Sequence, residues 1–150
     1  MPQNLSDPVT SLPTMDIKLE VVTLPVTDVD RAKSFYVDQL GFVADHDQTV
    51  SDEIRFVQLT PPGSACSIAF GKGLSTMEPG SLKAIMCVVA DIEAARAELT
   101  GRGVEVNGVD VQPWGKFVYF ADPDGNGWTY QELPEWSAGA GGSGSAAEEE

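Results

Sequence analysis

The sequence predicts an α+β fold made of two consecutive βαβββ modules, and three observations predict it. The chain resembles itself at an offset of 63 residues, where the segment 28–33 matches 91–96 acid for acid and apolar residue for apolar residue. In each half, a strand-like segment precedes this motif, and apolar residues at helical spacing follow. Three further strand-like segments, separated by turns rich in Pro and Gly, complete each half.

The first module is expected to begin with a strand over 17–24. Asp28 suits the cap of a helix, and Asp30 stands in the first turn, where the helix dipole favours negative charge. Gly41 ends this helix. The apolar stripe of the helix consists of Val29, Ala32, Phe35 or Tyr36, and Leu40. The remaining strands of the module are expected over 42–45, 54–59 and 65–70.

The second module repeats this order, beginning with a strand over 82–89. Asp91 is the expected helix cap, with Glu93 in the first turn. The helix presents the stripe Ile92, Ala95 and Leu99, and Gly101 or Gly103 ends it. The last three strands are expected over 104–106, 116–121 and 128–133. The run 122–127 between the last two resembles a calcium loop only superficially and is better explained as a hairpin turn.

The net charge of the chain limits the classes of molecule that the protein is expected to bind. Twenty-three acidic residues against nine basic ones give a net charge of −14. Such a surface repels nucleic acid and anionic lipid, whereas it attracts a cationic small molecule. Cys66 and Cys87 are expected to be buried, reduced thiols. No membrane span and no signal peptide is found in the sequence, so a cytoplasmic protein is expected.

The composition divides the chain into a folded unit and two arms. Residues 1–15 carry three prolines with no period, and 137–150 have the composition of a flexible Gly, Ser and Ala linker with an acidic end. We expect the folded domain over 16–136, with modules at about 16–76 and 80–136.

Three motifs resemble those of a known family, the vicinal oxygen chelate superfamily, which includes glyoxalase I, bleomycin resistance proteins and extradiol dioxygenases. These are 24–36 (LPVTDVDRAKSFY), 40–42 (LGF) and 122–128 (DPDGNGW). The resemblance implies that the two modules form an eight-stranded incomplete barrel around a cup, with helices on the outside. It also implies a homodimer.

Metal enzymes of this superfamily place a His on the first strand of each module and a Glu on the last strand. Counting from the shared motifs, these positions hold Val21, Ala84, Ser67 and Thr129. Valine and alanine have no donor atom, and neutral hydroxyls bind divalent ions weakly. We therefore expect neither a metal nor another cofactor.

The only histidine, His46, stands between Asp45 and Asp47. Strand alternation would put both acids on the face opposite His46, so the three would not converge on a metal. We expect this segment to be a solvated loop after the second strand.

Alternation also predicts the lining of the cup. The expected ligand-binding residues are Val21, Thr23, Ser67, Ala69, Ala84, Met86, Trp114, Tyr119, Thr129 and Gln131. Either Phe56 and Phe120, or Phe117 and Tyr119, face the cup, and the sequence leaves this choice open. Trp114 lies over the cup mouth or folds back on the barrel, whereas Trp128 points toward the helices.

These residues favour metal-independent binding or sequestration of a small, partly aromatic or cationic molecule in the cup. No catalytic residue is identified. The alternative is a lyase or isomerase of the glyoxalase type with a non-standard or absent metal site. The expected partners are a small-molecule ligand and a second copy of the chain, and no nucleic acid or membrane.

Overall fold

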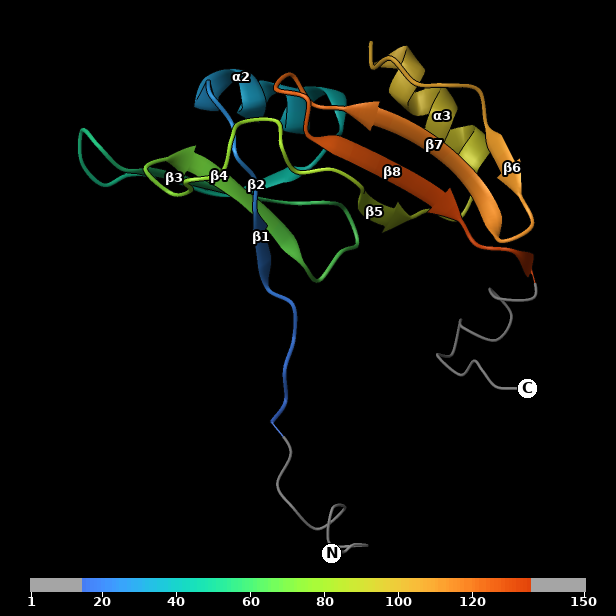
Figure 1. The fold of residues 1–150 in the computed structure, drawn as a ribbon, viewed down its shortest axis with the longest axis horizontal. Helices are drawn as coiled ribbons and strands as arrows, with labels where there is room; N and C mark the ends of the chain where they lie inside the picture. The colour runs from blue at the N-terminus through green and yellow to red at the C-terminus, as the bar shows by residue number, and fades with distance from the viewer. Residues whose placement is uncertain (1–14, 136–150) are drawn as a thin grey trace, which may run out of the picture.

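The computed structural model describes residues 15–135, which form two four-stranded sheets with helices packed on one side (Figure 1). The strand order is β1-β4-β3-β2 in one sheet and β5-β8-β7-β6 in the other, so the two modules are built alike. No strand of one sheet is paired with a strand of the other within the described residues, and the barrel is incomplete. The predicted α+β fold with two βαβββ modules is confirmed. None of the helices in 15–135 is long and apolar enough to cross a membrane.

Module 1 comprises β1 (Val21–Thr23), α2 (Val29–Ser34), the π-helical turn η1 (Phe35–Gln39), β2 (Val43–Thr49), β3 (Arg55–Thr60) and β4 (Ser67–Lys72). The helix begins where predicted, because the Asp28 carboxylate accepts a hydrogen bond from the Arg31 N–H at 3.1 Å. β1 runs parallel to β4, and the other neighbours are antiparallel.

Module 2 comprises β5 (Ile85–Val88), α3 (Ile92–Gly101), β6 (Asp110–Gln112), β7 (Gly115–Ala121) and β8 (Gly127–Glu132). Asp91 caps α3 through the Ala94 N–H, again as predicted. Residues 122–127 form the turn between β7 and β8, in which Gly125 has a φ of +99°.

The core lies between the sheets and the helices, and aromatic side chains join the two modules there. Tyr36 of η1 packs against Phe42, Phe70 and Trp128 with ring centroids 5.6–5.7 Å apart. Trp128 is 2% exposed and Tyr36 is fully buried. The predicted orientation of Trp128, toward the helix layer, is confirmed.

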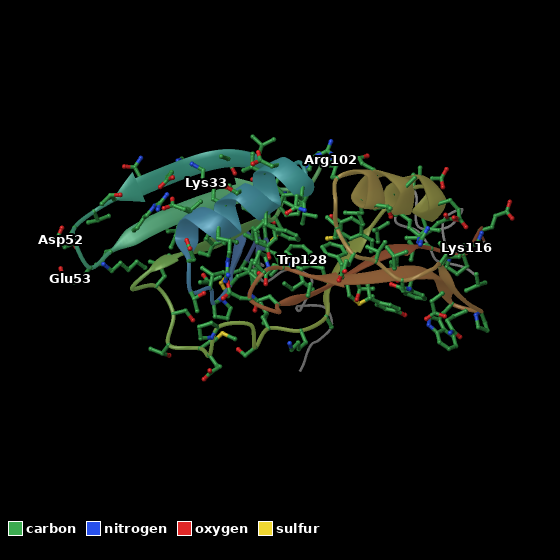
Figure 2. The ribbon with its side chains drawn as sticks, turned by 90° about the horizontal axis from the view of Figure 1, so that it is seen from above. Lys33, Asp52, Glu53, Arg102, Lys116 and Trp128 are labelled. Carbon is green, nitrogen blue, oxygen red and sulfur yellow. The ribbon has the colours of Figure 1, made fainter. Side chains whose placement is uncertain are left out.

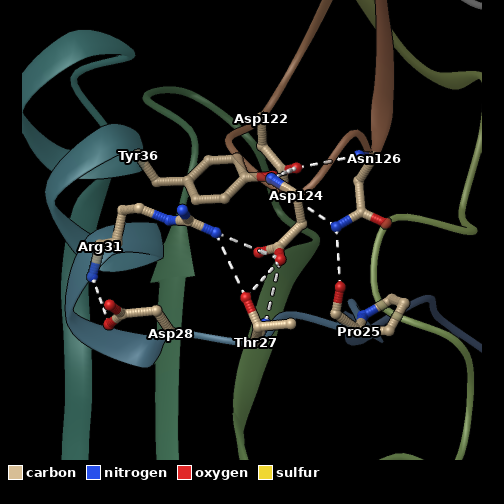
Figure 3. A network of polar contacts seen from close by, with 8 residues as sticks. All are labelled: Pro25, Thr27, Asp28, Arg31, Tyr36, Asp122, Asp124 and Asn126. Carbon is tan, nitrogen blue, oxygen red and sulfur yellow. Dashed lines mark hydrogen bonds and ion pairs between the residues drawn. The ribbon is translucent and has the colours of Figure 1, made fainter.

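A buried polar network crosses the same boundary (Figure 3). The Tyr36 hydroxyl donates to Asp122 Oδ2 at 2.7 Å and accepts from Trp128 Nε1 at 2.9 Å. Asn126 Nδ2 donates to the same carboxylate oxygen and to the Pro25 carbonyl. Burial raises the pKa of Tyr36, and the neighbouring Asp122 raises it further, so the hydroxyl stays protonated. The motif 122–128 thus holds the modules together.

Several strand predictions differ from the structure in extent or position, and β5 spans only Ile85–Val88 of the expected 82–89. The strand expected over 17–24 is shorter in the structure, where β1 spans Val21–Thr23, since its neighbour β4 begins at Ser67. The strand expected over 104–106 is absent there, because the Val104 N–H bonds to the Leu99 carbonyl at the helix end. β6 instead follows at Asp110–Gln112.

The second strand, expected over 42–45, is longer in the structure, where β2 spans Val43–Thr49. Its polar residues after Ala44 do not show the pattern of a half-buried strand. β2 pairs with β3 through Thr49. The predictions for the arms fall largely on 1–14 and 136–150, outside the described residues.

Candidate functional site

The candidate site is the face of each sheet that carries no helix. α2 and α3 lie on the same side of the two sheets, so both uncovered faces look away from them (Figure 1). We call these surfaces the open faces. That of module 1 consists of Val21, Thr23, His46, Phe56, Gln58, Thr60, Ser67 and Ala69, and that of module 2 of Met86, Val88, Asp110, Gln112, Phe117, Tyr119, Thr129 and Gln131.

Alternation assigns these faces without ambiguity. On β3, Val57 and Leu59 belong to the helix-side core, so the residues between them face the other way. On β7, Val118 and Phe120 belong to that core, so Phe117 and Tyr119 lie on the open face. Neither of the two predicted alternatives holds as stated, because Phe56, Phe117 and Tyr119 lie on the open faces whereas Phe120 lies on the helix side.

A chain of hydroxyl groups crosses the open face of module 1. Thr60 Oγ1 donates to Asp45 Oδ2 and lies 2.7 Å from Ser67 Oγ. Since the single Thr60 proton goes to the carboxylate, Ser67 is the donor to Thr60. Ser67 is buried at the middle of this face and keeps lone pairs that can accept from a ligand.

An acid also organises the open face of module 2. Asp110 accepts from the Tyr119 hydroxyl at 2.7 Å through Oδ2 and from Gln112 Nε2 at 2.8 Å through Oδ1. The bond to Asp110 raises the pKa of Tyr119 and keeps its hydroxyl protonated. The rings of Phe117 and Tyr119 are parallel within 2°, with centroids 6.3 Å apart.

Apolar side chains complete the open faces and are unusually accessible. Met86 is 54% exposed and Val88 is 61% exposed, although both lie in a strand. Val21 of β1 is 38% exposed. β1 and β5 are the edge strands of their sheets, so these residues form apolar borders with no neighbour in the described chain.

The register shows which residues occupy the metal-ligand positions of the superfamily. Val21 is the strand partner of Ser67, as expected, but the partner of Thr129 is Met86 and not Ala84. Ala84 precedes β5 and has a φ of +60°, in the left-handed region. The count from Asp91 fails because the connection from β5 to α3 is shorter than that from β1 to α2.

The donor chemistry of these positions does not fit a divalent metal. A valine with a serine, and a methionine with a threonine, offer no imidazole and no carboxylate. Within 15–135, no group of three or more His, Cys, Asp and Glu side chains lies close enough to hold a metal ion.

His46 lies in β2 rather than in a loop, which corrects the prediction for this segment. It pairs with Gln58 and is exposed on the open face of module 1. A bulge at Asp45 turns this acid toward Thr60 on the same face, whereas Asp47 bonds to Lys33 and Arg55 on the helix side. The two acids therefore do not share a face.

Two hollows adjoin the sheets, the first mainly on the helix side. One of about 210 Å³ lies between the modules, lined by Leu40, Pro61, Cys87, Val88 and Tyr130 among others. Burial raises the pKa of the Cys87 thiol to about 11 and also raises that of Tyr130, so both stay protonated. The other, of about 800 Å³, lies at the ends of the strands and reaches Val88 and Gln112.

The remaining predicted lining residues fall into two groups. Thr23, Ala69 and Gln131 lie on the open faces by their strand pairing. Trp114 lies in the turn between β6 and β7 and is 61% exposed, so it does not fold back on the core.

Sequence reasoning missed Asp45, Thr60, Asp110 and Gln112. Asp110 and Gln112 were missed because β6 was predicted at other residues, and Asp45 was missed because the bulge changes the face on which it lies. Only Thr60 could have been found from the sequence. It follows the apolar Leu59 in a strand, so alternation puts it on the opposite face.

Comparisons with known proteins agree with this architecture. The chain matches the model of the Glyoxalase/Bleomycin resistance protein/Dioxygenase superfamily over residues 18–130. It is similar to the solved structure of TnmS3, an antibiotic binding protein from Streptomyces sp. CB03234, with a TM-score of 0.73 and 35% identity, over 81% of this chain and 100% of that one. A member of the same superfamily from Sphaerobacter thermophilus DSM 20745 gives a TM-score of 0.71 and 32% identity, over 79% and 99% of the two chains. The uncharacterized protein YetH of Bacillus subtilis (strain 168) is 27% identical over 111 residues, 73% of this chain and 92% of YetH.

Proposed function

Since this chain belongs to the Glyoxalase/Bleomycin resistance protein/Dioxygenase superfamily, we propose that it binds and sequesters a small, partly aromatic or cationic molecule on its open faces, without a metal. The observation that carries this proposal is the content of those faces. They combine accessible apolar and aromatic side chains with a few fixed polar groups, which is the composition of a small-molecule site. The antibiotic binding protein TnmS3, at 35% identity, supports a binding role.

Chemistry of the glyoxalase type has less support from the residues. The positions that hold the metal in such enzymes carry Val21, Ser67, Met86 and Thr129. None of these side chains is an acid or base that titrates near neutral pH. Binding requires only the shape and polarity that the open faces already have.

We propose that the binding form is a homodimer. The apolar borders at β1 and β5 are edge strands with exposed side chains, and an uncovered strand edge of this kind pairs readily with another chain. A second copy of the chain would cover these borders and deepen the open faces into cups. Light scattering should give twice the chain mass of 16.0 kDa, and a mass of one chain at high micromolar concentration would contradict the dimer. We expect this form in the cytoplasm.

A planar neutral probe, acridine-9-carboxamide, tests the binding proposal by quenching of tryptophan fluorescence and by thermal shift. We expect saturable quenching and a raised Tm. Val88→Lys should weaken binding at least about tenfold, since it places a charge against an apolar ring. Val50→Lys is the matched control, because Val50 is similarly exposed, at 67%, but lies in the loop between β2 and β3. No binding of this or other planar probes, or equal loss in both variants, would contradict the proposal.

A further inference from the structure

The basic residues of this protein are sorted away from the open faces. All nine lie within 15–135. Three stand in strands, and each faces the helix side: Arg55 bonds to Asp30, Lys72 is the strand partner of Arg55, and Lys116 is the partner of Glu132. Glu132 accepts from the Ile92 N–H at the start of α3, which fixes that face.

The other basic residues lie on helices or in segments outside the sheets. They are Lys18, Arg31, Lys33, Lys83, Arg96 and Arg102. The described open faces therefore carry two carboxylates, Asp45 and Asp110, and no Lys or Arg. A ligand carboxylate would meet no cation there, whereas a ligand cation would meet an acid.

The hydrogen bonds around Asp110 make this acid an acceptor for a ligand. The Tyr119 hydroxyl donates a hydrogen bond to one carboxylate oxygen of Asp110, and Gln112 Nε2 donates one to the other. Each carboxylate oxygen has a second lone pair, and the Gln112 carbonyl oxygen is also an acceptor. Two neighbouring side chains thus hold the carboxylate in place while its acceptor capacity remains free.

Aromatic side chains lie next to Asp110 but not next to Asp45. Tyr119 is 44% exposed and bonds to Asp110. Phe117, the strand partner of Asp110, is buried, and its ring is parallel to that of Tyr119. Around Asp45 the contacts on the open face are the hydroxyls of Thr60 and Ser67. The face of a ring attracts a cation, and in module 2 the acid is bonded directly to a residue that carries an exposed ring, Tyr119.

We propose that Asp110, held by Tyr119 and Gln112, binds a protonated nitrogen of a ligand whose planar aromatic body lies against the exposed Tyr119 ring. This inference rests on the proposed binding function and assigns it a ligand class, the aromatic amines and amidines that are cationic at neutral pH. Ligands whose reactive or recognition group is a carboxylate are excluded from this site by the same arrangement.

Three tricyclic probes of nearly the same shape test the assignment: 9-aminoacridine, which is cationic, acridine-9-carboxamide, which is neutral, and acridine-9-carboxylate. Titration calorimetry on the full chain should give about tenfold tighter binding for the cation than for the neutral probe, as expected for a charge-assisted bond at a partly exposed acid. The carboxylate should bind most weakly.

Asp110→Asn keeps the shape of the side chain and should remove the preference for the cationic over the neutral probe. Asp52→Asn makes the same change of charge in the loop between β2 and β3, at the far end of the molecule from Lys116 and β7 (Figure 2), and should leave the preference intact. An unchanged Tm for both variants shows that folding is not the cause.

The outcomes separate this inference from the proposed function. Equal binding of the cationic and neutral probes, or the same loss of preference in Asp110→Asn and Asp52→Asn, overturns the role of Asp110 and leaves the binding function standing. Failure of all three probes to bind overturns both.

Discussion

Removing the Tyr36 hydroxyl should destabilise the protein more than its single oxygen atom would suggest. Tyr36→Phe keeps the ring and its contacts with Phe42, Phe70 and Trp128. It deletes the bond to Asp122 and leaves the Trp128 N–H without its acceptor. Both modules contribute to these contacts, so the loss falls on the junction between them.

The magnitude follows from the burial of the partners. A hydrogen bond to a charged group contributes about 1.5–3 kcal/mol, and a buried donor left without a partner costs about 1–3 kcal/mol. Asp122 Oδ2 keeps its bond from Asn126, which limits the first term. We therefore expect a loss of about 3 kcal/mol, which for a domain of this size lowers Tm by roughly 10 °C.

Urea denaturation followed by circular dichroism measures this change, and Tyr130→Phe is the matched control. Tyr130 is half-buried and packs edge-to-face on Phe120, as Tyr36 packs on its aromatic neighbours, but no hydrogen bond of its hydroxyl is found within the described chain. We expect its replacement to change the free energy of unfolding by less than about 0.5 kcal/mol. A similar small loss in both variants would refute the reasoning. In a Trp128→Phe background, Tyr36→Phe should cost about 1 kcal/mol less, because the orphaned donor is gone.

Three further changes test other parts of the fold. Gly80→Ala should cost more than about 2 kcal/mol in urea denaturation, because φ is +80° and the added Cβ would lie 2.0 Å from a backbone oxygen, whereas Gly101→Ala, with nothing within 4 Å, should stabilise by about 0.5 kcal/mol. Hydrogen bonds from Arg55 and Lys33 lower the pKa of Asp47. The contribution of Asp47 to stability is therefore present above about pH 4 and is lost as the pH falls through the lowered pKa. Asp47→Asn should make the free energy of unfolding depend less steeply on pH in the acid range, as urea denaturation at several pH values would show. Burial raises the pKa of Cys87 to about 11, so in a Cys66→Ser variant iodoacetamide at pH 8 should label the native protein far more slowly than the urea-unfolded chain, as mass spectrometry would show.

The repeat in the sequence predicted the fold because it reports local requirements. Asp28 and Asp91 cap helices, and the turn 122–127 needs its glycine, so the same residues recur where the same backbone is built. Strand alternation likewise placed Thr23 and Gln131 on the faces where they lie. These features depend on neighbours in the chain.

The site depended on register, which the sequence carries only weakly. A connection two residues shorter in module 2 moved Met86 into the position expected for Ala84. A bulge at Asp45 reversed the side on which that acid lies. β6 was predicted at 104–106, but the Val104 N–H bonds to the Leu99 carbonyl at the end of α3 and the Val104 side chain packs in the core. A shift of one or two residues is invisible in a hydropathy pattern, yet it decides which polar groups meet.

The central claim is that the open faces of the sheets bind a planar aromatic ligand. Amide shifts in two-dimensional NMR spectra of the labelled full chain, titrated with 9-aminoacridine, test it most directly. We predict that the perturbed amides cluster on the open face of module 2, at Met86, Asp110, Phe117 and Tyr119 above all. Perturbations confined to the helices, or none at saturating probe, would contradict the claim.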